Sequence, residues 1–283
     1  MFPLALCNEI LQPLPFAEQC KAAAALGYMG LEVAPFTLAD DPMRISDDEA
    51  RGFAHVAAEH GIAITGLHWL LVAPSGLSMV SPEASLRQRT TSVMRRMVEL
   101  CALMGGKYLV HGSPRQRSVP PDESREATLA RARECLESAA QRAQECGVTY
   151  CIEPLARNET DVLNTVEEAV ALVDEIGLPS FKTMIDCSAA GQTESLPVHA
   201  LITRWLPTGK IGHVQVNDPN RRAPGQGRLE FAPILAALKA GGYGGVLAVE
   251  SFDYVPDGTG SAAYAIAYLR GVEQAMARAG GMS

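Results

Sequence analysis

The sequence predicts a (β/α)8 barrel, the α/β fold in which eight parallel strands close into a cylinder that helices surround. Three observations favour it. Short apolar runs typical of buried parallel strands alternate with segments of helical periodicity along the whole chain. Eight such runs fit within 283 residues, a usual length for a barrel. No glycine-rich nucleotide-binding motif opens a helix after any strand, which argues against the main alternative, an open doubly wound sheet.

The predicted strands are short runs rich in valine, isoleucine, leucine and other apolar residues, and a helical pattern follows each one. They are expected at residues 3–9, 29–34, 62–71, 107–112, 148–155, 181–187, 210–217 and 246–252. No linker, low-complexity tract or block of charge divides the chain, so residues 1–283 are expected to form a single barrel domain. The longest loops at the site are expected at 219–227 and 73–82.

The helices between the strands are marked by their periodicity and by their ends. Between residues 123 and 147, apolar side chains recur at spacings of three and four, which indicates one buried helix face. Capping boxes are predicted at Ser46 and Thr165, and Ser81-Pro82 is expected to open another helix. Glycines suited to helix C-termini follow four of the helical segments: Gly61, Gly105, Gly147 and Gly177.

Charge and composition narrow the class of function. The net charge of −8 argues against nucleic acid as a partner, because a basic surface is expected there. No apolar run approaches the ~20 residues that span a bilayer, and no basic segment precedes the first strand, so no membrane association and no secretory signal are expected. Seven cysteines without a C-x-x-C pair favour the reduced cytoplasm.

Carboxylates end three of the last four predicted strands. Glu153, Asp186 and Glu250 each close an apolar run, and Gln215 stands near the end of a fourth. Burying carboxylates is costly unless a partner neutralises them, and the carboxyl ends of barrel strands meet at one mouth. Carboxylate and amide oxygens suit Mg²⁺ or Mn²⁺. The pattern therefore predicts one shared divalent cation.

Three motifs carry a family resemblance that extends over nearly the whole chain. They are Glu153-Pro-Leu-Ala-Arg-Asn-Glu159 with Asn164-Thr165, then His213-Val-Gln-Val-Asn-Asp-Pro-Asn-Arg221 with Pro224-Gly-Gln-Gly227, and Val249-Glu250-Ser-Phe. In these the sequence resembles the sugar phosphate isomerase/epimerase superfamily, whose barrels are xylose isomerase-like and which includes ketose 3-epimerases similar to D-tagatose 3-epimerase. Dimers or tetramers are common among such proteins, so a homo-oligomer is a possible assembly.

The resemblance implies a metal-dependent sugar epimerase or isomerase. Glu153, Asp186, Gln215 and Glu250 would hold the ion, Mn²⁺ or Mg²⁺. Glu153 and Glu250 would also move a proton on and off carbon through a metal-stabilised enediolate. The family positions at Glu159 and Arg221 bind substrate, and the former also steadies a catalytic glutamate.

Two positions depart from the family pattern. Gln215 stands where the family has a metal-binding histidine, with His213 two residues earlier as the alternative ligand. Ala189 replaces a substrate-binding histidine, which leaves the substrate open. His68 and His111, after the third and fourth strands, resemble the extra metal ligands of endonuclease IV and are predicted to contact substrate instead. Trp69 is predicted to form an apolar wall for a sugar.

Three other functions remain open at this stage. A lyase or dehydratase acting on a keto-sugar or polyol would use the same carbanion chemistry and then expel a leaving group. A non-catalytic barrel that binds a small molecule would explain the missing imidazole ligand. A DNA-repair nuclease is opposed by the acidic charge and by the absence of further metal ligands in the sequence.

Overall fold

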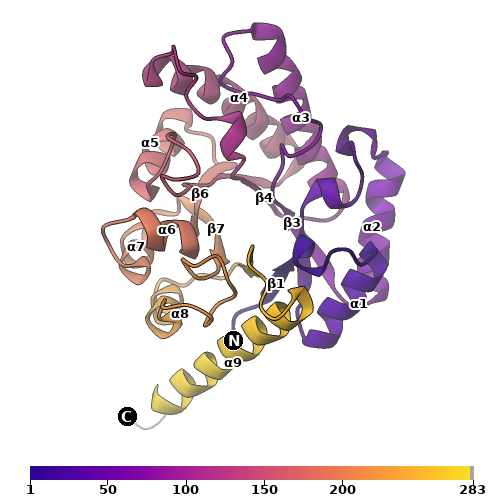
Figure 1. Ribbon diagram of the computed structural model, residues 1–283, viewed down its shortest axis with the longest axis vertical. Coiled ribbons are helices and arrows are strands. Elements are labelled where there is room, and N and C mark those ends of the chain that lie inside the picture. The colour runs from indigo at the N-terminus through magenta and orange to yellow at the C-terminus, as the bar shows by residue number, and fades with distance from the viewer. Residues whose placement is uncertain (281–283) are drawn as a thin grey trace.

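The computed structural model describes residues 1–280 and is built around a closed barrel of eight parallel strands, β1 to β8, in chain order (Figure 1). The prediction of a (β/α)8 barrel is confirmed. The strands are shorter than predicted because several strand-like runs continue into turns. Their bounds are β1 Leu4–Cys7, β2 Gly30–Val33, β3 Ala63–Leu67, β4 Tyr108–His111, β5 Thr149–Ile152, β6 Phe181–Asp186, β7 Ile211–Val216 and β8 Leu247–Val249.

Helices form a ring around the strands, and the last one extends past the barrel toward the C-terminus (Figure 1). Two of them, α6 and α7, follow β6, and a 3-10 turn, η1 (Asn8–Leu11), follows β1. The α-helices are α1 Phe16–Leu26, α2 Asp47–Glu59, α3 Ala84–Leu103, α4 Arg125–Cys146, α5 Val166–Ile176, α6 Cys187–Thr193, α7 Val198–Trp205, α8 Phe231–Ala240 and α9 Gly258–Gly280.

The helix ends test the local predictions. The side chains of Ser46 and Thr165 both accept the expected capping hydrogen bonds, at the starts of α2 and α5. Gly147 and Gly177 end α4 and α5 in the left-handed conformation, which costs glycine little because it lacks a Cβ. The prediction at Ser81-Pro82 is wrong, since α3 begins at Ala84; the Ser81 hydroxyl instead accepts a hydrogen bond from the backbone of Glu83.

Strand pairing brings the polar strand ends to one mouth of the barrel. Asp186 and Gln215 are register partners between β6 and β7. Irregularities in register occur between Leu31 and Glu32 and between Thr183 and Met184, and such bulges re-aim the side chains beside them. The barrel wall itself is packed with apolar side chains from strands and helices. No helix within residues 1–280 combines the length and apolar character that crossing a membrane requires.

Candidate active site

Three carboxylates converge at the mouth of the barrel. Glu153 follows β5, Asp186 is the last residue of β6, and Glu250 follows β8. One oxygen from each lies within 4.8 Å of an oxygen from both others, and all three residues are buried. The three acids that the sequence places at the ends of separate strands therefore lie close together in the fold.

The three acids disfavour one another's ionisation. Burial raises the pKa of Glu153 well above its ordinary value, and the charges of Glu250 and Asp186 raise it further. Burial and the charge of Glu250 raise the pKa of Asp186 to about 8, and burial also raises the pKa of Glu250. A divalent cation between these oxygens would remove that repulsion, so the electrostatics of the cluster suit a metal ion.

The orientation of Asp186 is fixed by two neighbours. Its Oδ1 accepts a hydrogen bond from the backbone N–H of Ala189 at 2.6 Å, which caps α6, and its Oδ2 accepts one from Asn217 Nδ2 at 2.7 Å. Asn217 is fixed in turn, because its Oδ1 accepts from the backbone of Ser188 at 2.7 Å. Sequence reasoning missed Asn217, although it lies two residues after Gln215 and strand alternation places both on one face.

Gln215 offers an oxygen to the site. Its Nε2 donates to Glu32 Oε1 at 2.7 Å, while its Oε1 is buried and has no hydrogen-bond partner among the described residues. A buried, unpartnered oxygen costs free energy unless a ligand satisfies it, so this atom fits a hard cation. His213 lies elsewhere: its Nε2 is 2.8 Å from Glu32 Oε2, and its ring stacks on Tyr108 with centroids 3.9 Å apart.

Glu32 lies at the centre of this deeper polar layer. It is fully buried, but His213, His68 and the Tyr108 hydroxyl outweigh the effect of burial and lower its pKa to about 2. Glu32 therefore remains a carboxylate, which keeps both His213 and the amide nitrogen of Gln215 pointing toward it.

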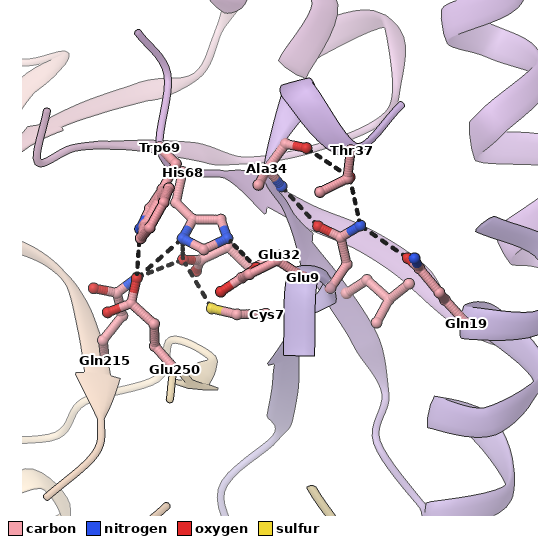
Figure 2. A network of polar contacts seen from close by, with 12 residues as sticks. Cys7, Glu9, Gln19, Glu32, Ala34, Thr37, His68, Trp69, Gln215 and Glu250 are labelled. Atoms are coloured by element: carbon pink, nitrogen blue, oxygen red, sulfur yellow. Dashed lines mark hydrogen bonds and ion pairs between the residues drawn. The ribbon is translucent and has the colours of Figure 1, made fainter. Parts of the chain in front are cut away.

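His68 joins Glu250 to the first strand's turn (Figure 2). Its Nδ1 lies 3.2 Å from Glu250 Oε1 and its Nε2 lies 2.9 Å from Glu9 Oε2. Burial alone would lower the pKa of His68, but the adjacent carboxylates raise it well above its ordinary value. The imidazole is fully buried, and both of its nitrogens have carboxylate partners in the protein. The predicted contact of His68 with substrate stays a prediction.

Trp69 and Phe252 form an aromatic wall beside the acids. The Trp69 Nε1 donates to Glu250 Oε1 at 3.2 Å, and its ring stacks on Phe252 with centroids 5.7 Å apart. The guanidinium of Arg221 lies 4.4 Å from the centroid of the Phe252 ring and 3.3 Å from the carboxylate of Glu159. The side chains predicted to bind substrate at 159 and 221 therefore pair with each other across the mouth.

A small cavity lies between these side chains and the acids. Its volume of about 20 Å³ holds little more than one water molecule. This volume is much smaller than a sugar, so we expect a lining side chain to move when one binds, and Arg221 is an exposed lining residue that pairs with Glu159. The lining residues include Glu153, Glu159, Asp186, Ala189, Arg221 and Phe252.

The segment after β4 supports Glu153 from the other side. Arg117 is fully buried and its Nη2 donates to the carbonyl oxygen of Glu153 at 2.7 Å; burial lowers its pKa to about 10. His111 bonds through Nδ1 to the hydroxyl of Tyr150 at 2.6 Å, and burial followed by the charge of Arg117 lowers its pKa to about 3. His111 is therefore neutral, and its predicted contact with substrate stays a prediction.

Comparison with known proteins identifies the fold family. The sequence model of the family described as xylose isomerase-like TIM barrel matches residues 20–272. The chain belongs to this family. D-psicose 3-epimerase of Agrobacterium fabrum (strain C58 / ATCC 33970) is 29% identical over 242 residues, which cover 84% of this chain and 79% of that protein. L-ribulose 3-epimerase of Mesorhizobium japonicum (strain LMG 29417 / CECT 9101 / MAFF 303099) is 26% identical, covering 73% and 68% respectively.

Solved structures of the xylose isomerase-like TIM barrel type share the architecture. A D-psicose 3-epimerase crystallised in the presence of D-fructose superposes with a TM-score of 0.79 at 23% identity, covering 96% of this chain and 99% of that one. A 3-keto-D-glucoside 4-epimerase from E. coli in its apo form gives 0.81 at 21% identity, covering 95% and 99%. At these identities the structural likeness supports the fold alone.

Proposed function

We propose that this chain is a metal-dependent ketose epimerase that exchanges the proton on a carbon next to a carbonyl group. The observation that carries the proposal is the convergence of Glu153, Asp186 and Glu250 beside the unpartnered oxygen of Gln215. The curated 3-epimerases of D-psicose and L-ribulose that the sequence resembles support a ketose as substrate.

The chemistry of the side-chain atoms at the site determines which metal ion it would bind. Glu153, Asp186, Gln215 and Glu250 would bind a divalent cation through oxygen atoms, which favours Mn²⁺ or Mg²⁺ over softer metals. When bound, the cation polarises a carbonyl group and stabilises the negative charge that develops on its oxygen. The repulsion among the three acids and the free amide oxygen both fit such an ion.

The two glutamates act as the acid and the base. One carboxylate removes the proton from the carbon adjacent to the carbonyl, and the other glutamate delivers a proton to the opposite face of the resulting enediolate. Glu153 and Glu250 follow β5 and β8, which are not neighbours in the barrel, so they reach the same centre from separate parts of the mouth. Glu159 and Arg221 would then bind sugar hydroxyls, while Trp69 and Phe252 exclude water from the reacting carbon.

The test is proton exchange in D₂O. Purified protein with Mn²⁺ is incubated with D-psicose, D-fructose, L-ribulose and other ketoses, and deuterium on carbon is followed by NMR. Deuterium at one carbon together with the C3 epimer is the expected result. Deuterium incorporation must be lost after a chelator removes the metal ion, and it must be lost in the Glu153→Gln variant. Protein that binds Mn²⁺ yet exchanges no proton in any ketose would overturn the proposal and support a binding barrel.

A lyase reaction is the second candidate, and Ala189 is the observation that favours it. This small residue lines the cavity where the resembling epimerases have a substrate-binding histidine. Without that contact, the carbanion formed by proton removal could expel a leaving group. The mass of the product separates the two reactions, because epimerisation leaves the mass unchanged and elimination of water lowers it.

A further inference from the structure

We infer that Glu9 and His68 form a positioning pair that holds Glu250 in its reactive orientation, a role that nothing in the family resemblance assigns to them. The inference rests on the proposed function of Glu250. Its geometric basis is a chain of three side chains from three separate parts of the barrel: the turn η1, the end of β3 and the end of β8.

The contacts of Glu250 are directed to a single oxygen. His68 Nδ1 and Trp69 Nε1 each lie 3.2 Å from Glu250 Oε1 (Figure 2). Two donors on one oxygen fix the plane of the carboxylate, and they leave Oε2 outside this network. Glu250 can therefore be anchored through one oxygen and still present the other to a cation or a substrate.

Glu9 holds His68 in turn. Glu9 Oε2 lies 2.9 Å from His68 Nε2, and His68 is fully buried, so the ring cannot rotate without breaking contacts at both nitrogens. The turn that carries Glu9 is itself fixed by Asn8, whose Nδ2 donates to Gln19 and Thr37 and whose Oδ1 accepts from the backbone of Ala34. The pair is thus built on a rigid base.

Glu153 provides the contrast. Among the residues that the structure describes, no side chain donates a hydrogen bond to its carboxylate, and Arg117 bonds to its backbone carbonyl instead. The two proposed acid/base groups therefore differ: side chains of His68 and Trp69 contact the carboxylate of Glu250, whereas within residues 1–280 no side-chain hydrogen bond reaches that of Glu153. Because only Glu250 has such a supporting pair, we assign the pair a positioning role at Glu250. Removing the side chains that hydrogen-bond a metal ligand typically weakens metal binding about 10- to 100-fold.

Two substitutions of His68 separate the two ends of the network. In His68→Asn the amide nitrogen can occupy the place of Nδ1, so it can still donate to Glu250 but no longer reaches Glu9. In His68→Gln the amide nitrogen extends to the place of Nε2, so it reaches Glu9 but no longer Glu250. Ser180→Ala is the matched control: it removes another buried hydrogen bond, 2.7 Å to Ala140, immediately before β6 at the opposite end of the barrel.

The readouts are kcat and KM on the ketose that the wild type epimerises, and the Mn²⁺ dissociation constant from calorimetry. We expect His68→Gln to lower kcat about 100-fold with little change in KM and to weaken Mn²⁺ binding about tenfold, because small misplacements of a reacting group have effects of this size. His68→Asn should lose less, about tenfold in kcat, because its amide nitrogen can still donate to Glu250 but is no longer held by Glu9. Adding His68→Gln to Glu250→Gln should cost little more than Glu250→Gln alone.

Three results would overturn the inference. The first is equal loss in His68→Asn and His68→Gln while the Ser180→Ala control remains active. The second is full additivity with Glu250→Gln. The third is binding of two Mn²⁺ ions by the wild type and one by His68→Gln, which would make His68 a ligand. If the wild type epimerises no ketose, the proposed function fails, and the Mn²⁺ measurements on the same variants still test the positioning pair.

Discussion

The metal-free protein should lose stability as the pH rises toward 8, because its acids are crowded without a cation. The pKa of Asp186 is about 8 in the folded chain, against 3.8 ordinarily. For a carboxyl group with a raised folded pKa, stability is fully present below the unfolded pKa and is lost as the pH rises through the folded one. The raised pKa values of Glu153 and His68 also make the folded protein less stable as the pH rises toward 8.

The pH window follows from the neighbouring groups. The pKa of His111 is lowered to about 3, so its contribution to the free energy of unfolding grows as the pH rises to about 6.5 and is constant above that. Glu32, with a pKa of about 2, is ionised throughout. Between about pH 6.5 and 8, Asp186 alone should reduce the free energy of unfolding by about 2 kcal/mol, taking ~1.36 kcal/mol per pKa unit. That corresponds to a fall in Tm of about 4 °C or more for a chain of this size.

The assay is thermal unfolding of chelator-treated protein at the two pH values, repeated with saturating Mn²⁺. We expect Mn²⁺ to raise Tm more at the higher pH, because binding requires ionised ligands. Asp186→Asn is the control: it loses one hydrogen bond with Asn217 at every pH, but its own ionisation no longer contributes to the slope. If the Tm of the metal-free protein stays constant or rises between about pH 6.5 and 8, the conclusion that Asp186 has a raised pKa is refuted.

Other substitutions test single contacts. Glu153→Gln and Glu250→Gln should each lower kcat by about 10²–10⁴ in the D₂O exchange assay, whereas an unchanged rate would remove that residue from the chemistry. Gly112→Ala should lower kcat at least about tenfold while circular dichroism stays native, because an added Cβ would clash with Glu153 Oε2 and must displace it. Arg221→Ala should raise KM more than it lowers kcat, since the guanidinium is proposed to bind sugar hydroxyls and not the reacting carbon; an unchanged KM would contradict this role. Gln215→His should strengthen Co²⁺ binding relative to Mg²⁺, as titration calorimetry can measure, unless the side chain is not a ligand.

The barrel and the positions of its acids could be predicted because they depend on local patterns. A strand buried on both faces is a continuous apolar run, and the polar residue that ends it lies at the mouth by topology. These two rules were enough to predict where Glu153, Asp186 and Glu250 lie. The strand ends themselves were less predictable, since Glu9 and His68 belong to strand-like runs that the structure turns into a 3-10 helix and a loop.

The supporting contacts could not be predicted, because they join distant segments through side-chain geometry. His68 and Glu250 are 182 residues apart, and their contact depends on how β8, β1, β2 and β3 curve around the mouth. Glu32 is aimed inward beside an irregularity in register that no residue pattern marks. Arg117 follows a strand in a segment of ordinary loop composition, so its full burial beside Glu153 has no sequence signal.

The geometry of Gln215 explains how the site could keep a ligand without the imidazole that the resembling family has. A metal-binding histidine commonly donates one ring N–H to a carboxylate and coordinates the ion through the other nitrogen. Gln215 is arranged in the same way: its amide nitrogen donates to the permanently ionised Glu32, which leaves its oxygen directed away from that carboxylate and unpartnered. In the proposed site the amide would thus perform both tasks with an oxygen in place of a nitrogen. The exchange would make the donor set entirely oxygen, which shifts the expected preference toward Mg²⁺ and Mn²⁺ and away from metals that favour imidazole.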